Sequence, residues 1–550
     1  MRTFSNENRQ ETWKAIQQKN VDLLVIGGGI TGAGIALDAT TRGLRTVSVD
    51  MQDFAAGTSS RSTKLIHGGL RYLKQLQMNV VAEVGKERSI VYHNAPHITT
   101  PLWMMLPFYK GGTFGRVSTQ LGLTVYDRLA QVKKSERKQM LTKSEAMEKE
   151  PLLQADGLKG AGYYVEYRTD DARLTIEVMK KAVQLGAEAL NYAEVTRCLY
   201  NDSGSIIGVR VHDHILQEEY DVYARTIVNA TGPWVDHIRS MDNSIDDKSL
   251  YITKGVHLIF EKSRFPLQQP IYFDVRDGRM VFAIPRDDKT YVGTTDTHYS
   301  DSYIHPTITK EDEQYLLDAV NEMFPSLSLH KKDIVSKYAG LRPLIAEEGK
   351  SADEISRKDE LFTSPSGLIS IAGGKLTGYR KMAEKAVDAV AAKMKEEDAI
   401  LYTESTTKYL RLSGGEFEDI TSFEGFKEQM IKEGEERYID KELMNRCLHT
   451  YGKNCTTILS IFDTLDPEKY PPEEQRFVLA QLHYSYTYEC MYSLVDFFKR
   501  RTGWLYFHIE DVQKYNNIAA CYMAELTGWT EEEKTQHMDQ LYAHMKRVTV

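Results

Sequence analysis

The sequence predicts an α/β protein in which a parallel-sheet domain is assembled from separated stretches of chain, an antiparallel-sheet domain is inserted into it, and an all-α domain follows. Three observations support this prediction. A short apolar run near the start of the chain leads into a glycine-rich turn, and two later apolar runs end in glycine turns of their own. The last part of the chain reads as helices with little Gly or Pro inside them. At 550 residues, the chain is also too long for a single core.

Composition and charge exclude several classes of protein. The formal net charge of −9 and the mean hydropathy of −0.44 predict a soluble globular chain with no nucleic-acid partner, because general nucleic-acid binders usually carry a basic excess. The N-terminus lacks the apolar segment of a signal peptide, and no apolar run of about 18 residues follows, so we expect a cytoplasmic protein with no membrane-spanning helix. Five cysteines at no CxxC spacing predict neither a metal site nor a disulfide framework.

The first glycine turn stands in a strand, turn, helix, strand order. Residues 22–26, DLLVI, lead directly into Gly27-x-Gly29-x-x-Gly32, AGIALDATTRG predicts a helix, and RTVSVD predicts a second strand that ends on Asp50. This is the order of a dinucleotide-binding fingerprint. Gly27 permits the tight turn, Gly29 lets the backbone approach a pyrophosphate, Gly32 allows close helix packing, and Asp50 lies where an acid accepts hydrogen bonds from a ribose.

Two later segments repeat the pattern of a strand followed by a glycine turn. ARTIVNATGPWVDHI (224–238) breaks a strand at Ala230-Thr231-Gly232, and GLISIAGGKLTGYRKMAEKAV (367–387) places Gly373-Gly374 between a strand and a helix. A nicotinamide enzyme of the doubly wound type would continue with alternating strands and helices, whereas here the second strand runs directly into a polar segment. A flavin-binding domain built from separated stretches explains all three pieces, although the ATG piece alone is also compatible with an ordinary strand-to-loop turn.

Seven segments, in this order and spacing, resemble the FAD-dependent glycerol-3-phosphate dehydrogenases: GGGITGAGIALDATTRGL, TSSRSTKLIHGGLRYL, YRTDDARL, NATGPWVD, KGVHLIF, LRPL and AGGKLTGYR. The resemblance runs from about residue 20 to residue 390, and the C-terminal part is also similar in length and helical character. It implies a Rossmann-like FAD-binding domain with an inserted antiparallel-sheet substrate domain, as in amino-acid-oxidase-like flavoproteins. It further implies oxidation of sn-glycerol 3-phosphate to dihydroxyacetone phosphate by hydride transfer from C2 to FAD, with the electrons passed to a membrane quinone.

The polar segment TSSRSTKLIHGGLRYL (58–73) reads as a loop that crosses beside the flavin. We expect Thr58, Ser59 and Ser60 to hydrogen-bond the pyrophosphate, and Gly68 with its neighbour Gly69 to let backbone amides approach the flat ring. Lys64 and His67 are predicted as further cofactor contacts. The alternative for the cations of this segment, Lys64 and Arg71, is that they are solvated surface charges.

The resemblance places Arg71, Tyr72, Arg342 and Lys375 in the substrate pocket, and Gly374 and Thr377 in the loop that approaches the flavin. A physical argument points the same way, because glycerol 3-phosphate carries about −2 charge near neutral pH and a partly dry pocket must offer it Arg or Lys partners. Arg342 is stiffened by the following proline of LRPL, and Lys375 lies just beyond a glycine turn at a predicted helix start. Either residue is alternatively a mere surface cation.

Oxidation at C2 also needs a base for the hydroxyl proton. His257, in KGVHLIF, is the first candidate because histidine titrates near physiological pH, although a histidine beside an apolar strand is often structural. His67 is the second candidate, and Arg342 could instead lower the pKa of the hydroxyl electrostatically. The catalytic set is therefore predicted as Arg342, Lys375 and His257, with the base left open.

The predicted domains are discontinuous. Residues 1–19 form an N-terminal extension; residues 20–75, 172–235 and 340–392 form the FAD-binding domain; residues 76–171 and 236–339 form the substrate domain, where MVFAIP and TYVGTTDT predict antiparallel strands; and residues 393–550 form the helical domain. Within the helical domain, FFKRRTGWLYF (497–507) mixes basic and aromatic residues. It reads as an amphipathic helix end with its aromatics in a core, as a membrane-surface segment or, least of all, as a base-stacking segment.

The electron acceptor separates the competing functions. Oxidases that resemble this family tend to carry an added segment between the arginine of LRPL and the lysine of GGK, and only 32 residues separate Arg342 from Lys375 here. We therefore expect a quinone acceptor, met by peripheral contact with the inner face of the cytoplasmic membrane for which FFKRRTGWLYF is the candidate surface, and leave a homodimer open. The alternatives are an oxidase of the same substrate that uses oxygen and a non-catalytic flavin-binding protein.

Overall fold

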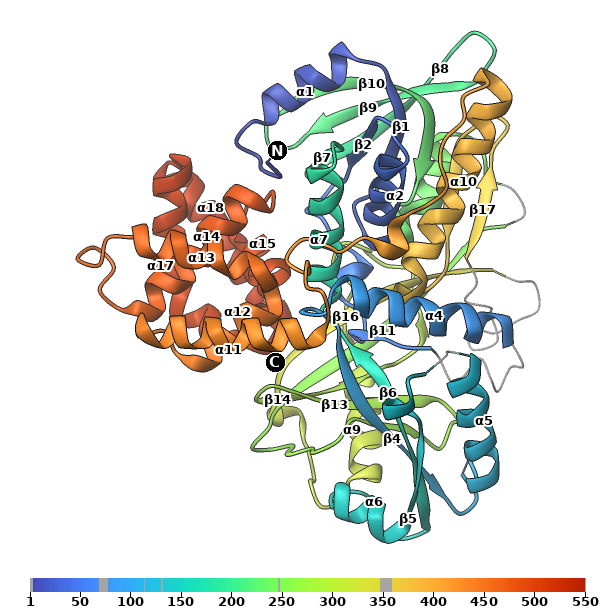
Figure 1. Cartoon of the computed structure of the whole chain (residues 1–550), viewed down its shortest axis with the longest axis vertical. Coiled ribbons are helices and arrows are strands. Elements are labelled where there is room, and N and C mark those ends of the chain that lie inside the picture. The colour runs from blue at the N-terminus through green and yellow to red at the C-terminus, as the bar shows by residue number, and fades with distance from the viewer. Residues whose placement is uncertain are drawn as a thin grey trace.

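The computed structural model describes residues 3–68, 78–112, 114–129, 132–245, 248–346 and 359–549. These residues form two sheets and a separate group of helices (Figure 1). The first sheet lies in the upper part of the view and the second in the lower part, and the C-terminal helices, orange to red, lie to one side of both. The arrangement confirms the predicted fold class.

The first sheet is parallel at its centre. Its main path runs β17-β18-β10-β1-β2-β7, with β1 paired in parallel to both β10 and β2. The strands are β1 (Val21–Ile26), β2 (Thr46–Val49), β7 (Glu188–Leu190), β8 (Ala193–Tyr200), β9 (Ile206–Asp213), β10 (Glu218–Asn229), β17 (Glu360–Thr363) and β18 (Ile369–Ala372). Because β1, β10 and β18 are parallel neighbours, the three predicted glycine turns, which follow these strands, meet at one edge of the sheet.

Five helices accompany the first sheet: α1 (Arg9–Gln18), α2 (Ile30–Thr41), α7 (Asp171–Gln184), α8 (Val235–Met241) and α10 (Tyr379–Asp398). Of these, α2 packs between α7 and α10. The predicted N-terminal extension, as α1, packs on the same sheet, since Trp13 stacks on Tyr220 with ring centroids 4.2 Å apart and donates a hydrogen bond to Asp213 at 2.5 Å.

The second sheet is antiparallel except where β12 meets β4. Its strands are β3 (Leu65–Ile66), β4 (Thr100–Tyr109), β5 (Gln139–Thr142), β6 (Leu158–Arg168), β11 (Leu250–Glu261), β12 (Ile271–Asp274), β13 (Met280–Arg286), β14 (Lys289–Gly293), β15 (Thr297–His298) and β16 (Ile334–Ile345). The predicted strand MVFAIP becomes β13, which pairs with β14. The predicted strand TYVGTTDT is shorter in the structure, because β14 ends at Gly293 and β15 begins only at Thr297. The accompanying helices are α4 (Met78–Asn94), α5 (Arg116–Leu129), α6 (Lys143–Lys149) and α9 (Lys310–Met323).

Two strands that the predicted boundaries assign wholly or partly to the FAD-binding domain pair with strands of the second sheet. β3 lies within the stretch 20–75 assigned to the FAD-binding domain, yet it pairs with β6 of the second sheet. β16 begins before residue 340 and pairs with β11 along its whole length, so it cannot be divided at that boundary. We therefore propose that the substrate domain takes both strands.

The C-terminal helices form one apolar core: α11 (Ile420–Glu436), α12 (Lys441–Tyr451), α13 (Cys455–Thr464), α14 (Glu473–Tyr488), α15 (Leu494–Asp496), α16 (Trp504–Phe507), α17 (Ile509–Thr527) and α18 (Glu531–Val548). No described helix combines the length and the apolar character that crossing a bilayer requires.

The segment FFKRRTGWLYF is not a membrane-contact surface. Phe497–Arg501 forms a single π-helical turn whose five side chains are all buried, and Trp504–Phe507 is buried as α16. The alternative reading, with the aromatics in a core, is correct. Two of its basic residues are buried against an acidic partner: Arg500 and Arg501 both pair with Asp53, which follows β2 in the first sheet.

Candidate functional site

Two adjoining cavities lie at the edge of the first sheet where the glycine turns meet. The first cavity, about 170 Å³, is lined by residues of all three turns, including Gly27, Gly232 and Gly374. The second cavity, about 250 Å³, lies toward the second sheet. Thr58, Ser59, Gly374 and Lys375 line both cavities, so a long ligand can extend from one into the other.

The glycines of the fingerprint leave no room for side chains. Gly27 has a φ of +107°, and a Cβ there would lie 2.7 Å from the carbonyl oxygen of Ala230. A Cβ on Gly32 would lie 1.8 Å from the carbonyl oxygen of Gly27, so this glycine permits close helix packing and does not line either cavity. Gly29 is the N-cap of α2 without a side-chain cap, and the Ile30 N–H donates to Ser59 Oγ at 2.9 Å. The uncapped helix start at the cavity wall fits a pyrophosphate.

Asp50 lies on the wall of the first cavity directly after β2. Its carboxylate accepts hydrogen bonds from the N–H groups of Gly28 at 2.6 Å and Gln52 at 2.8 Å. Burial outweighs these bonds and raises the pKa of Asp50 to about 6. A ligand that donates hydroxyl hydrogen bonds to this carboxylate therefore stabilises the charged form, which burial disfavours.

Asp50→Ala is expected to raise the Kd for FAD by about 5- to 150-fold, because a hydrogen bond to a charged acceptor is worth about 1–3 kcal/mol.

In the wild type, FAD affinity should fall as the pH drops below about 6, because the carboxyl group then holds a proton, and the variant should lose this pH dependence. Fluorescence titration of the apoprotein with FAD measures both effects. Asp22→Ala is the matched control, since Asp22 accepts the Arg45 N–H at 2.8 Å and does not line either cavity. An unchanged Kd in Asp50→Ala would remove Asp50 from the ribose site.

Arg342 and Lys375 both line the second cavity. Arg342, on β16, donates hydrogen bonds to Thr294 Oγ1 at 2.8 Å and to the Thr295 carbonyl and Asp296 Oδ1 at 3.1 Å. The guanidinium lies over Gly255, where a Cβ would be 2.3 Å from Nη2. Both residues therefore belong to a cavity wall and are not simple surface cations.

His257 lies on β11, two residues from Gly255 and on the same face of the strand as the Arg342 guanidinium. Its ring stacks on Tyr338 with centroids 4.6 Å apart, and Nε2 lies 3.0 Å from Thr63 Oγ1. Burial, with smaller contributions from Arg342 and Lys64, holds the pKa of His257 well below 6.5. The ring is therefore neutral near pH 7 and able to accept a proton.

The remaining predicted residues divide into three groups. Gly29, Ala230 and Gly232 line the first cavity, and His67 and Thr377 line the second, where the Thr377 hydroxyl hydrogen-bonds the His67 backbone. Three others line neither cavity: Ser60, Lys64 and Gly68. Gly69, Arg71 and Tyr72 lie outside the described residues.

Lys64 is neither a solvated surface charge nor part of a cavity wall. Its side chain is buried and forms an ion pair with Asp171, and its ammonium also lies 3.4 Å from the Ser60 carbonyl oxygen. Gly68 donates its N–H to Glu166 at 3.3 Å. Both residues therefore fix the polar segment through contacts that lie outside the two cavities.

Sequence reasoning missed Arg61, Thr294 and Asp296, which also line the second cavity. Arg61 lies within the polar segment 58–73, and its positive charge could have identified it as a candidate ligand for a phosphate. Thr294 and Asp296 follow β14, and their role depends on strand pairing that brings the end of β14 beside β11, which no local pattern shows.

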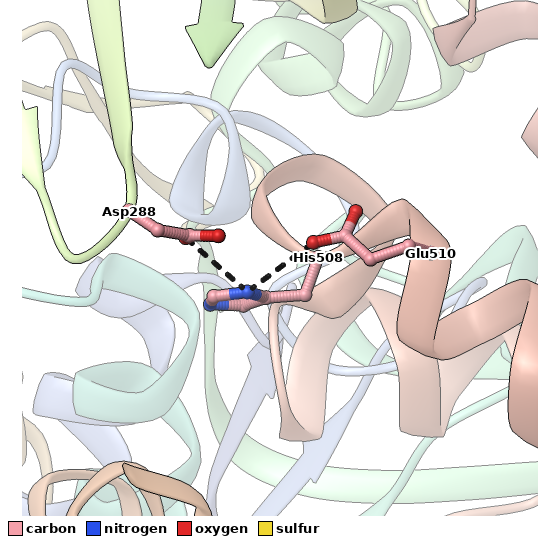
Figure 2. Close-up of side chains that lie close together, drawn as sticks. All are labelled: Asp288, His508 and Glu510. Carbon is pink, nitrogen blue, oxygen red and sulfur yellow. Dashed lines mark ion pairs between the residues drawn. The ribbon is translucent and has the colours of Figure 1, made fainter. Parts of the chain in front are cut away.

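One group of side chains has the composition of a metal site, Asp288, His508 and Glu510 (Figure 2). His508 Nδ1 lies 3.7 Å from Asp288 and 4.0 Å from Glu510. The two carboxylates already have a cation, because Lys289 Nζ lies 2.8 Å from Asp288 and 3.0 Å from Glu510. We assign these residues to an ion-pair cluster between the β13–β14 hairpin and α17.

Comparison with known proteins gives consistent results. A family model described as FAD dependent oxidoreductase matches residues 22–380, and one described as C-terminal domain of alpha-glycerophosphate oxidase matches residues 405–534. The aerobic glycerol-3-phosphate dehydrogenase of Bacillus subtilis is 52% identical over 98% of this chain and 97% of its own, and that of Staphylococcus aureus is 50% identical over the same shares.

Among solved structures, the glycerol-3-phosphate dehydrogenase of Bacillus halodurans complexed with FAD matches with a TM-score of 0.85 and 45% identity over 99% of this chain and 98% of that one. The L-alpha-glycerophosphate oxidase of Mycoplasma pneumoniae with FAD bound matches with a TM-score of 0.55 and 18% identity over 70% of this chain and 97% of that one, a likeness of fold alone.

Proposed function

The chain belongs to the FAD-dependent oxidoreductase family, among the aerobic glycerol-3-phosphate dehydrogenases, and on this premise we propose that it oxidises sn-glycerol 3-phosphate to dihydroxyacetone phosphate. FAD, when bound, supplies the acceptor for the hydride that leaves C2. The observation that carries the proposal is the pair of adjoining cavities: the first fits a dinucleotide, and the second brings Arg342, Lys375 and His257 together.

The residues of the second cavity have distinct roles in the proposal. Arg342 and Lys375 supply the positive charge that a phosphate dianion needs. Because the Arg342 guanidinium lies beside His257, it also stabilises the negative charge that develops on the C2 oxygen as its proton leaves. His257 accepts that proton on its imidazole, and the ring is held in place by Tyr338 and Thr63. A dianionic substrate offsets the nearby cations and so raises the proton affinity of the imidazole.

The direct test is anaerobic. The purified holoenzyme should lose its flavin absorbance when sn-glycerol 3-phosphate is added in the absence of oxygen, and dihydroxyacetone phosphate should form in an amount equal to the flavin reduced. Glycerol 2-phosphate, whose phosphate sits on C2, is the control and should leave the absorbance unchanged. Retained absorbance with sn-glycerol 3-phosphate would favour a non-catalytic flavin-binding protein.

Arg342→Lys is expected to lower kcat/KM roughly 100-fold although the charge is kept, because an ammonium cannot reproduce the hydrogen bonds that the guanidinium makes from two nitrogens. Steady-state assays with an artificial dye as acceptor measure the effect, and the flavin spectrum should not change. Arg264→Lys is the control: Arg264 makes a similar two-nitrogen contact with Asp333, at 2.9 and 3.2 Å, on the surface. Wild-type kinetics for Arg342→Lys would exclude Arg342 from the site.

For the electron acceptor we propose a membrane quinone, reached by peripheral contact with the inner face of the cytoplasmic membrane. The short stretch between Arg342 and Lys375 supports this, since oxidases that resemble the family tend to carry an added segment there. The buried FFKRRTGWLYF segment is not the contact surface. A homodimer stays a prediction.

The acceptor proposal predicts that substrate-reduced flavin reoxidises at least about 10-fold more slowly with oxygen than with a soluble quinone analogue. Separate stopped-flow runs after anaerobic reduction with sn-glycerol 3-phosphate measure both rates. Reoxidation by oxygen as fast as turnover with the quinone, with one hydrogen peroxide formed per flavin, would establish an oxidase instead.

A further inference from the structure

A third cavity, about 270 Å³, lies where the polar segment, the loop before α9 and the C-terminal helices meet. Six basic side chains line it: Arg61, His305, Lys337, Lys499, His544 and Arg547. Its described lining includes no Asp or Glu. It shares Arg61 with the second cavity and is otherwise separate from it.

Two of these cations have no acidic partner among the described residues. Lys499 is only 5% exposed and forms no ion pair with the described residues. Asp53 pairs with Arg500 and Arg501, and Asp496 pairs with Arg500. Arg547 is exposed on the last turn of α18 and also forms no ion pair. In contrast, Lys337 is neutralised by Glu313 at 2.6 Å.

Arg61 is the third cation without a carboxylate partner in the described structure. It is buried, its Nη2 donates to the carbonyl oxygen of Ile304 at 3.0 Å, and its Nε has no hydrogen-bond partner. A guanidinium with an unsatisfied buried donor is costly to bury. Arg61 therefore keeps a donor that an anionic ligand can satisfy.

The two histidines of this cavity, His305 and His544, also experience its positive charge. Their rings are in contact, with centroids 5.2 Å apart. The pKa of His305 is lowered to about 4, mainly by burial and further by Arg547 and Lys499. The pKa of His544 is lowered to about 2, mainly by burial and further by Lys499 and Arg500. Burial first, and then Arg61 and Arg500, hold the pKa of Lys499 well below its usual range. The acidic groups of the surroundings do not offset these cations.

We propose that this cavity binds a phosphate group through Arg61, Lys499 and Arg547, at a second site that adjoins the cavity of the oxidised substrate and shares only Arg61 with it. The guanidinium of Arg61 provides directed donors for phosphate oxygens. A bound phosphate also favours the charged form of Lys499, which burial beside Arg61 and Arg500 otherwise disfavours. The volume admits a phosphate with a few carbon atoms attached. The phosphate belongs either to a small phosphate ester or to a lipid headgroup, and the proposal does not depend on the redox function.

Binding of inorganic phosphate to the holoenzyme tests the proposal, measured by equilibrium dialysis with radiolabelled phosphate. Lys499→Met and Arg547→Gln should each weaken the binding of one phosphate per chain on the order of 10-fold or more. Lys546→Gln is the matched control on the neighbouring position of α18, outside the cavity lining, and should change the affinity by less than about twofold. Arg547 is exposed, so its variant keeps the test decisive even if Lys499→Met fails to fold.

A flotation assay distinguishes the two sources of the phosphate. Vesicles of phosphatidylcholine alone are compared with vesicles that also contain phosphatidic acid. Phosphate binding that the two variants weaken supports a small phosphate ester. Flotation that requires phosphatidic acid and is lost in the variants, without variant-dependent binding of free phosphate, supports a lipid headgroup. Equal phosphate binding and equal flotation by wild type, Arg547→Gln and any folded Lys499→Met would overturn the proposal.

Discussion

His257→Gln is expected to lower kcat by about 10²- to 10⁴-fold, the range that a positioned general base contributes. Glutamine can keep a hydrogen bond to Thr63, 3.0 Å from Nε2 in the wild type, but it cannot take up the proton from the C2 hydroxyl. Rapid-mixing measurement of flavin reduction by sn-glycerol 3-phosphate isolates the step. A kcat within about threefold of the wild type would exclude His257 as the base.

The pH profile adds a second readout for His257. Because its pKa lies well below 6.5, the neutral, proton-accepting ring is present at pH 6.5 and above and is lost only as the pH falls below that value. The acid limb of kcat/KM in the wild type should therefore lie below pH 6.5, and the glutamine variant should lack it. His97→Gln is the matched control, since His97 is also buried with its pKa well below 6.5 and lines neither the first nor the second cavity. An equal loss of activity in both variants would indicate a general packing effect.

Asp53→Ala is expected to reduce the free energy of unfolding by about 3–5 kcal/mol, the cost of leaving buried charges without their partner. Asp53 is 1% exposed and accepts hydrogen bonds from Arg500, from Arg501 at 2.7 and 2.9 Å, and from Asn191 at 2.9 Å. Denaturant unfolding followed by tryptophan fluorescence measures the change. A loss below about 1 kcal/mol would show that the cluster adds little to stability.

The stabilisation by Asp53 also depends on pH. Burial disfavours its charge, but Arg501 and Arg500 outweigh burial and lower the pKa to about 2, below the ordinary value of 3.8. The ion pairs therefore stabilise the fold above about pH 4 and lose their effect as the pH falls toward 2, so wild type and variant should converge there. Asp333→Ala is the control: its pKa is also about 2, yet its pairing with exposed Arg264 is a surface contact worth only about 0–1 kcal/mol.

The parts of the fold that follow from neighbouring residues could be predicted from the sequence. The turn at Gly27, Gly29 and Gly32 is a local pattern, and the strand pairing places it as that pattern requires. The same holds for the helices predicted in the last part of the chain, of which EEEKTQHMDQLYAHMKRV forms α18. In each case the physical cause, a backbone turn or a helical periodicity, lies within about 20 residues.

The parts that depend on distant residues could not be predicted. Nothing within FFKRRTGWLYF shows that Asp53 is the partner of Arg500 and Arg501, so a basic aromatic stretch on a helix offered a membrane surface as one reading. In the same way, Lys64 is predicted as a cofactor contact from its place in the polar segment, and nothing in that segment shows that its ammonium pairs with Asp171, more than 100 residues later. Whether a cation faces a ligand or a carboxylate is decided by tertiary pairing.

The distance along the chain between the members of the Asp53 cluster determines when the cluster can form during synthesis. Asp53 and its partner Arg500 are 447 residues apart. A ribosome that adds about 5–20 residues per second takes roughly 20 to 90 s to cover that distance, and throughout this time the carboxylate after β2 has no guanidinium to pair with. The edge of the first sheet that carries Asp50 therefore stays incomplete until the last helices have emerged. A nascent chain released before Arg500 is translated lacks both guanidinium partners of Asp53. We expect such a chain to be degraded as an incompletely folded protein.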